Sequence, residues 1–395
     1  MFKNAGGAMQ LYLMYQDEKV AKLTIDLDVD PSEAVISLQP CDVALLPFSV
    51  KYAPDMYVLD EMSIWLANRC IPKHRKNINQ LTSYLQTTPY IWMIANHGAS
   101  LQDGFWLKKP DELLQWKDIN MFNRKFDYSI GNLMFDRTSP VYVYDTPDLT
   151  TGGIMPKTWR IKDNKQFLLK HGSAPDFTEP YNEKAASELL KRYCPVPFVT
   201  YDVINVEDYT CSICENFMNP SLELVTAAQL ARTADKPEFL TMTMHIKERC
   251  KTFGIPDYKP FMDYMTLTDY LIGNTDRNLN NYGFLYSIET GQFLGPAPIY
   301  DNGTSFTTMP INLEYEEIIK KTRNKARTVF KDFSKHFEPN LHLLNDYSDW
   351  LYNYFLNIYP TEHLDRILDI VDLRYETAEK HLDRSRYRHI EEYER

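Results

Sequence analysis

Two short segments in the second half of the chain carry side chains suited to metal and hydroxyl chemistry. The segment GNTDRNLNNYGFL places Asp276 and Asn281 five residues apart, on a loop that follows an apolar helix. This spacing lets a carboxylate face a substrate while the amide oxygen turns toward a metal. In PIYDNGTSF, Asp301 follows a strand-like tripeptide and precedes Asn302-Gly303, a pair typical of tight turns. Because Mg²⁺ prefers oxygen ligands of this kind, these side chains are candidates for the metal ligands and the orienting carboxylate of a phosphoryl-transfer site.

Each segment also has an ordinary structural explanation. A D-x-x-x-x-N spacing arises by chance about once in a chain of this length. Asp276 can cap a turn, Asn281 can bond to its own backbone, and Asp301-Asn302-Gly303 can form a hairpin turn. The functional interpretation therefore depends on nucleotide-binding features that occur upstream in a workable order.

The upstream segment LTTGGIMPKTWRIKDNKQFLLKHGS predicts a loop, a strand, a turn and a second strand. Gly152 and Gly153 allow backbone N–H groups to approach phosphate oxygens. Lys170 ends the second strand, where it can lay its stem along the sheet and place its ammonium on the α- and β-phosphates of a nucleotide. Lys157 is a second candidate phosphate contact. A glycine hairpin and surface lysines are the structural alternatives.

A predicted helix and a connecting segment complete the nucleotide features. In YNEKAASELLKRYC, Glu183 lies in the first turn and can pair with Lys170. Without that pair, Glu183 is an ordinary acid at a helix start. After a predicted hairpin at 198–213, Glu215, Asn216 and Phe217 form a predicted connection between two lobes. Backbone groups of such a connection can bond the edge of an adenine.

These segments need a scaffold that brings them together. Nine of the fourteen glycines lie from Gly152 to Gly303, so loops of unusual geometry are concentrated in the middle of the chain. Strands at 11–15 and 21–25, with helical stripes at 58–66 and 78–85, predict a small α/β domain before residue 150. Periodicity after Gly303 predicts helices. The predicted fold class is therefore α+β, a bilobal protein-kinase-like fold with an N-terminal α/β domain at 1–148, a kinase N-lobe at 149–218 and a mostly helical C-lobe at 219–395.

Composition narrows the functional classes. The 395 residues are 44% hydrophobic and carry a net charge of −11, as expected for a globular chain. This charge argues against direct nucleic-acid binding. The lack of basic surface runs and of an amphipathic cationic helix makes a phosphoinositide substrate less attractive. No apolar run approaches the roughly 18 to 20 residues that span a bilayer, and the start, MFKNAGGAMQ, lacks an apolar signal core. We therefore expect a cytoplasmic protein with no membrane partner.

With these motifs in place, the chain resembles the HipA-like serine/threonine kinase family. Its members are bacterial, are often toxin components of toxin–antitoxin systems, and are distantly related to phosphatidylinositol 3/4-kinases. The likeness runs from about 150 to 306 and fades into the helical C-terminus. Its most specific pieces are GGIMPKTW, Asn182-Glu183, GNTDRNLNN and IYDNG.

The resemblance implies roles for the candidate residues. Asp276 would be the catalytic base, Asn281 and Asp301 would bind Mg²⁺, and Lys170 would hold ATP. Thr150 and Thr151 lie where family toxins can carry an inhibitory phosphorylated serine, so the family also suggests self-phosphorylation there. A protein substrate and an antitoxin or other regulatory protein are the implied partners.

Two departures from the family pattern leave the activity open. Asn278 stands where family members often have His, and DNG replaces the DFG of protein kinases. An active serine/threonine kinase is the first hypothesis. A pseudokinase or nucleotide-binding scaffold that acts through a protein partner is the second, and a lipid or small-molecule kinase is the third.

Overall fold

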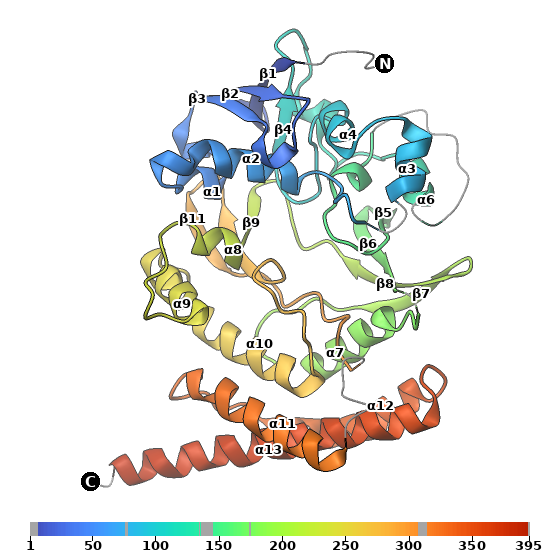
Figure 1. The fold of residues 1–395 in the computed structure, drawn as a ribbon, viewed down its shortest axis with the longest axis vertical. Coiled ribbons are helices and arrows are strands. Elements are labelled where there is room, and N and C mark those ends of the chain that lie inside the picture. Colours follow the sequence, from blue (N-terminus) through green and yellow to red (C-terminus); the bar gives the residue numbers. More distant parts are fainter. Residues whose placement is uncertain are drawn as a thin grey trace.

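The described part of the chain combines antiparallel sheets with helices α1 to α13 (Figure 1). The computed structural model describes residues 7–75, 78–133, 135, 145–173, 175–306 and 314–393.

The first sheet is formed by the N-terminal segment. Its strand order is β3-β2-β1-β4, and all its neighbouring strands are antiparallel. Leu23 and Ile25 lie two positions apart on one strand and are both buried in the core, as period-2 patterning predicts. The strands are β1 (Ala8–Tyr15), β2 (Glu18–Asp26), β3 (Val35–Pro40) and β4 (Phe105–Lys108). The helices of this segment are α1 (Phe48–Lys51), α2 (Val58–Asn68), α3 (Ile78–Leu85), α4 (Pro89–Ala95), α5 (Trp116–Ile119) and α6 (Ser129–Leu133).

The second sheet carries the predicted lysine strand. Its order is β5-β6-β8-β7, with Lys157 of β5 directly opposite Lys170 of β6. Asp163 and Asn164, which join these two strands, both have positive φ, the geometry of a two-residue hairpin turn. The elements are β5 (Lys157–Lys162), β6 (Lys165–His171), α7 (Glu179–Tyr193), β7 (Asp202–Val206) and β8 (Tyr209–Glu215). Helix α7 packs against β7 and β8 and places Glu183 beside β6.

The third sheet and helix α10 position the two candidate loops. The sheet has the order β11-β10-β9 and consists of β9 (Leu222–Thr226), β10 (Gly283–Ser287) and β11 (Gln292–Pro296). The nearby helices are α8 (Ala227–Ala231), α9 (Met242–Thr252) and α10 (Tyr258–Ile272). Gly273 ends α10 at φ 69°, a left-handed conformation that glycine adopts without strain. The chain therefore leaves the helix sharply, immediately before Asp276.

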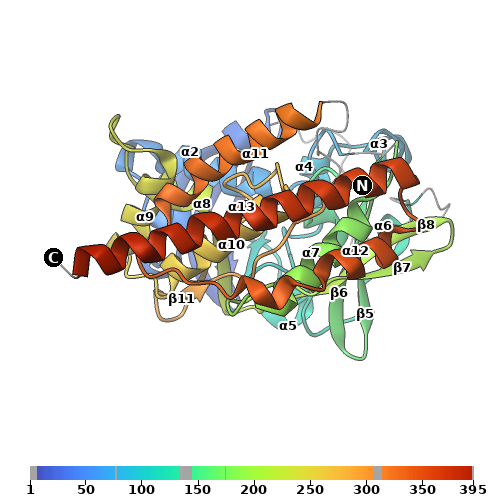
Figure 2. The same cartoon turned by 90° about the horizontal axis from the view of Figure 1, so that it is seen from below.

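The C-terminal region is helical, as predicted. It contains α11 (Tyr315–Val329), α12 (Tyr347–Phe355) and α13 (Thr361–Tyr393). Leu364, Ile367 and Val371 of α13 are buried in one core with residues of α7, α10 and α12. Seen from below, α13 crosses the molecule beneath these helices (Figure 2). The buried face of this helix thus packs against the site-bearing elements.

The largest apolar core is shared between the N-terminal segment and residues 225–299. Phe48 of α1 packs edge-on against Tyr286 of β10 and Phe293 of β11, with ring centroids 5.2 and 5.1 Å apart. In the same region Arg232 donates a hydrogen bond of 3.0 Å to Glu61 of α2. The α+β class predicted from the sequence is confirmed, while the division into two lobes and the boundaries at 148 and 218 stay predictions.

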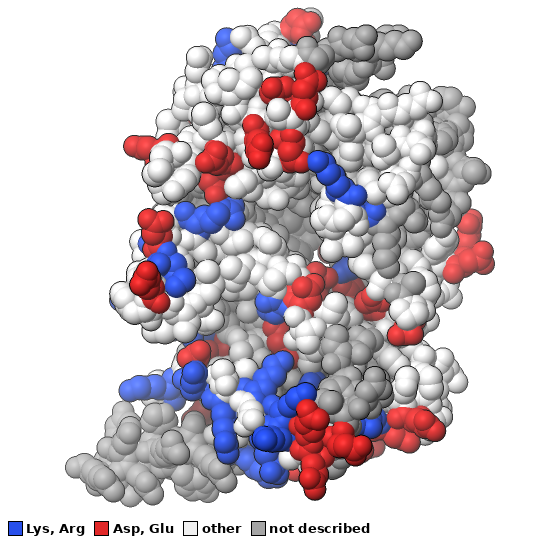
Figure 3. Space-filling model, in the orientation of Figure 1, with Lys and Arg blue, Asp and Glu red and all other residues white. Residues whose placement is uncertain are grey.

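One expectation from charge is wrong. Helix α11 presents a basic surface run, with Lys320, Arg323 and Arg327 all exposed. Figure 3 shows Lys and Arg gathered over this helix. The charge argument against a phosphoinositide substrate therefore no longer holds. Within the described residues, none of the helices combines the length and apolarity needed to cross a bilayer.

Candidate functional site

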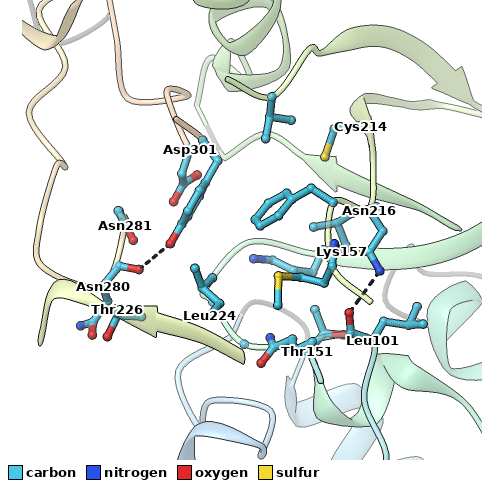
Figure 4. Close-up of a pocket in the computed structure, with 18 of the residues that line it drawn as sticks. Leu101, Thr151, Lys157, Cys214, Asn216, Leu224, Thr226, Asn280, Asn281 and Asp301 are labelled. Atoms are coloured by element: carbon cyan, nitrogen blue, oxygen red, sulfur yellow. Dashed lines mark hydrogen bonds between the residues drawn. The ribbon is translucent and has the colours of Figure 1, made fainter. Parts of the chain in front are cut away.

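The predicted site residues surround one cavity of about 430 Å³. Eight of them line it: Gly152, Gly153, Lys157, Lys170, Glu215, Phe217, Asn281 and Asp301. Figure 4 shows Asp301 and Asn281 on one side of the cavity and Lys157 on the other. The remaining two, Glu183 and Asp276, are each hydrogen-bonded to a lining residue. Segments separated by more than a hundred residues thus converge on a space of ligand size.

Lys170 is the charged centre of the cavity. Its Nζ donates 2.6 Å to Asp301 Oδ1 and donates a second, short hydrogen bond to Glu183 Oε1. The hydroxyl of Ser212 on β8 donates to the other oxygen of Glu183. The side chain of Glu183 is 1% exposed and that of Lys170 13%, whereas that of Asp301 is 37% exposed. Asp301 is therefore the member of this trio that remains open to a ligand.

Burial and the neighbouring charges shift the pKa values of Lys170 and Asp301 in opposite directions. Burial alone disfavours charge on Lys170, but Asp301 and Glu183 raise the pKa of its ammonium well above the ordinary value. Burial likewise disfavours ionised Asp301, but the Lys170 and Lys157 cations outweigh it and lower the pKa of Asp301 to about 2. At neutral pH, Lys170 is therefore protonated and Asp301 is an anion.

The candidate catalytic loop is held by its own amides. Asn281 Nδ2 donates to the backbone oxygen of Asp276 at 2.7 Å and to its Oδ2 at 3.2 Å. Asn278 Nδ2 donates to Asp276 Oδ1 at 3.0 Å, and Asn274 Oδ1 accepts the Asp276 N–H at 3.0 Å. Since the amide nitrogen of Asn281 turns toward Asp276, its amide oxygen is left to face a ligand.

Arg277 joins this loop to the turn that carries Asp301. Its Nε donates to both carboxylate oxygens of Asp269 on α10, at 3.0 and 3.3 Å. Its Nη1 donates to the carbonyls of Asn281, at 2.8 Å, and Tyr300, while Nη2 also reaches the Asn302 side chain. Sequence reasoning missed this residue, although it directly follows Asp276. One guanidinium thus fixes both candidate metal ligands relative to each other.

The turn at Asp301 is held by partners from α7, from α10 and from the residue before β7. Asp301 has φ 59°, a left-handed conformation that Asp tolerates better than most residues. Its N–H donates 3.2 Å to the hydroxyl of Tyr201. On its far side, Asn182 of α7 donates 3.0 Å to the Gly303 carbonyl, and the Phe306 N–H donates 3.0 Å to Ile272. These contacts point the Asp301 carboxylate at Lys170 and into the cavity.

The donor set fits Mg²⁺ bound together with a phosphate ligand. In the described part of the chain, His, Cys, Asp and Glu side chains do not gather in threes around a potential metal position. Mg²⁺ sites of phosphoryl-transfer enzymes commonly use one or two protein oxygens and complete the shell with phosphate oxygens and water. The Asp301 carboxylate and the Asn281 amide oxygen match this pattern.

The predicted connection at 215–217 lies at the cavity wall. The Asn216 N–H donates 2.8 Å to Gln166 of β6, and its side chain donates 3.1 Å to Leu101. The Glu215 carboxylate instead accepts from Lys165 at 2.9 Å in solvent, so only the backbone of Glu215 can serve a ligand in the cavity. Phe217 and Tyr300 lie with ring centroids 6.0 Å apart and offer an apolar surface for a flat base.

The two threonines before the glycine pair are buried. Thr150 donates 2.7 Å to the Ala99 carbonyl, and Thr151 donates 2.7 Å to Pro147 while accepting 2.8 Å from the Trp159 indole. A phosphate on either hydroxyl would displace these bonds. Self-phosphorylation at this position stays a prediction, and it requires the loop to open first.

Lys157 predicts a pH dependence of nucleotide binding. Burial, assisted by the cations of Lys170 and Arg75, lowers the pKa of Lys157 to about 7. A bound phosphate would raise this pKa again, so binding above pH 7 must take up a proton. We expect the affinity for ATP to fall about tenfold between pH 7 and 9, with fluorescence anisotropy of a labelled nucleotide as the measurement.

Two variants check this assignment. Lys157→Arg stays charged throughout the range and should lose the pH step, and Lys157→Met should bind more weakly at pH 7 without the step. An unchanged step in both variants would assign the titration to another group.

Comparison with solved structures shows that the fold is similar to that of a HipA kinase. The chain is similar to HipA of the Shewanella oneidensis MR-1 toxin–antitoxin system, solved with HipB and its operator DNA. The identity is 13%, the match covers 94% of this chain and 97% of that one, and the TM-score is 0.51. The predicted resemblance is confirmed at the level of the fold.

A second similar structure is the proinflammatory kinase CtkA of Helicobacter pylori. The identity is 16%, the match covers 60% of this chain and 94% of that one, and the TM-score is 0.41. No protein-family model matches the chain, and no curated protein sequence does.

Proposed function

We propose that the chain is an ATP- and Mg²⁺-dependent kinase that transfers the γ-phosphoryl group to a serine or threonine hydroxyl of a protein. The observation that carries the proposal is the convergence of four features on one cavity. These are the Lys170–Glu183 pair, the Asp301 anion, the Asn281–Asp276 loop and the glycine pair at 152–153. A loop over the phosphates, a cation, metal ligands and an orienting carboxylate are the parts that such a transfer requires.

The proposed roles follow from the contacts. Lys170, held by Glu183, would bind the α- and β-phosphates and thereby release its bond to Asp301. Asp301 and Asn281 would then hold Mg²⁺, which neutralises charge on the phosphate oxygens. Asp276 would accept the proton of the attacking hydroxyl as the new O–P bond forms and the bond to the leaving ADP oxygen breaks. Backbone groups near Phe217 would receive the adenine.

The second candidate function is a nucleotide-binding scaffold. It is favoured by one observation, namely that both carboxylate oxygens of Asp276 already accept from amides of its own loop, Asn278 and Asn281. Each oxygen keeps a second lone pair that can accept from a hydroxyl, but the two amides fix the carboxylate within its own loop, as a purely structural role would also require. By likeness to the HipA that was solved with HipB, a regulatory antitoxin-type protein is the partner we propose for either function.

Labelled ATP separates the two functions. With γ-labelled ATP, Mg²⁺ and bacterial lysate or casein as acceptor, we expect transfer that Asp276→Asn lowers by about 10²- to 10⁴-fold. Asp208→Asn, at an exposed hairpin turn, is the matched control and should transfer normally. Nucleotide binding without transfer to any acceptor would favour the scaffold. Mass spectrometry of the 145–156 peptide in the same reaction tests phosphate on Thr150 or Thr151.

A further inference from the structure

A buried arginine from the N-terminal segment lies beneath the glycine pair. Arg75, between α2 and α3, is 1% exposed. Its Nε donates 2.9 Å to the Gly153 carbonyl, and its Nη2 donates 2.7 Å to the Gly152 carbonyl and a further short bond to Thr151. The carbonyls of three successive loop residues thus accept hydrogen bonds from one guanidinium.

Peptide geometry then decides where the amide hydrogens point. In a trans peptide the C=O and the following N–H point in opposite directions. The N–H groups of Gly152, Gly153 and Ile154 therefore face away from Arg75. No acceptor among the described residues receives any of the three. Gly152 and Gly153 line the cavity, and successive backbone N–H groups without an acceptor are typical of sites that bind anions.

The geometry of the loop depends on glycine at 153. Gly153 has φ 90°, a region that side chains rarely adopt, and a Cβ added there would lie 2.3 Å from Lys157 Nζ. The Lys157 ammonium therefore sits directly against the loop. Neither Lys157 nor Arg75 forms an ion pair in the described part of the chain, and Arg75 uses its donors on carbonyls alone.

The charge of Arg75 is consequently available to the loop. The carboxylate that acts electrostatically on Arg75 is Asp148, whose two oxygens accept from the Trp159 N–H at 2.8 Å and the Thr158 hydroxyl at 2.9 Å rather than from Arg75. Lys157, Lys170 and Arg75 thus surround the glycine pair, and among them Lys170 alone forms direct ion pairs in the described part of the chain. Cationic groups beside free backbone N–H donors are suited to the phosphates of a nucleotide.

We propose that Arg75 is a positioning residue for the nucleotide phosphates: the N-terminal segment uses it to hold the N–H groups of residues 152–154 toward the β- and γ-phosphates. This inference rests on the proposed function of the cavity. It gives the N-terminal segment a direct part in nucleotide binding, because the loop loses its phosphate-binding shape when Arg75 is withdrawn.

Binding of ATP, ADP and adenosine to the full chain tests the proposal. In isothermal calorimetry, Arg75→Met should weaken ATP and ADP by about 10- to 100-fold, the range for losing charge-assisted hydrogen bonds, and leave adenosine within about threefold. Arg75→Lys keeps a cation with three donors and should recover part of the loss. Arg232→Met, which cuts another link between the N-terminal segment and the rest of the chain, is the control and should bind all three normally.

Amide hydrogen exchange gives a readout that needs no ligand. In ligand-free protein, Arg75→Met should accelerate exchange at residues 150–156, while Arg232→Met should not. Equal weakening of ATP and adenosine, or unchanged ATP binding with unchanged exchange, would overturn the role of Arg75. If the unmodified chain bound no nucleotide, the proposed function would fail, and the exchange result would still decide whether Arg75 holds the loop.

Discussion

Asp301→Asn is expected to lower phosphoryl transfer by about 10³-fold, because a divalent cation contributes several kcal/mol to such a reaction and this change removes its carboxylate ligand. The carboxylate is also the more open end of the Lys170 trio. Replacing it with an amide removes the anion that is bonded to Lys170 at 2.6 Å but leaves the Lys170–Glu183 pair. Transfer rates with labelled ATP, measured over a range of Mg²⁺ concentrations, check the prediction.

Two comparisons make this result specific. Adenosine should bind Asp301→Asn as it binds the unmodified chain, since the base and ribose do not depend on the metal. Asp208→Asn again serves as the neutral control. If the transfer rate of Asp301→Asn at saturating Mg²⁺ were within tenfold of the unmodified rate, the assignment of Asp301 as a metal ligand would be wrong.

Arg277→Met should destabilise the protein and the site together. The side chain of Arg277 is 9% exposed and that of its partner Asp269 is 13% exposed. Breaking a buried pair leaves an uncompensated charge and costs about 3–5 kcal/mol. The change also frees the carbonyls of Asn281 and Tyr300, so we expect a large loss of transfer. Urea unfolding and transfer rates measure the two effects.

Conservative variants separate fold from site. Arg277→Lys retains the charge next to Asp269 but cannot reach all the acceptors with three donors. It should therefore recover much of the stability while transfer remains low and requires more Mg²⁺. A lysine variant with full transfer at ordinary Mg²⁺ would show that Arg277 has only a structural role.

Local patterns were sufficient to predict the elements that carry the site. The apolar run at 167–169 in β6, the apolar face of α7 and the glycine after α10 each act within a few residues, so their effects are readable in the sequence. The Lys170–Glu183 pair could also be predicted, because the strand that carries the lysine is followed directly in the sequence by the helix that carries the acid. Asn281 and Asp301 meet because their loops flank one short hairpin, β10–β11.

Long-range contacts could not be predicted in this way. Arg75 reaches carbonyls at 151–153 across nearly eighty positions of sequence, and backbone acceptors carry no sequence signal. The links from Arg277 to Tyr300 and Asn302 are hidden for the same reason. The Lys170–Asp301 bond depends on the relative placement of two sheets, which residue types alone do not specify.

The core that joins the N-terminal sheet to residues 225–299 affects how the protein can fold during its synthesis on the ribosome. Leu13, Phe48 and Phe105 are synthesised first, but the side chains that cover them follow much later. At usual elongation rates the delay is roughly 10 to 40 s. During that interval the nascent chain exposes apolar surface, so its yield in the cell should depend on chaperones that bind incomplete polypeptides.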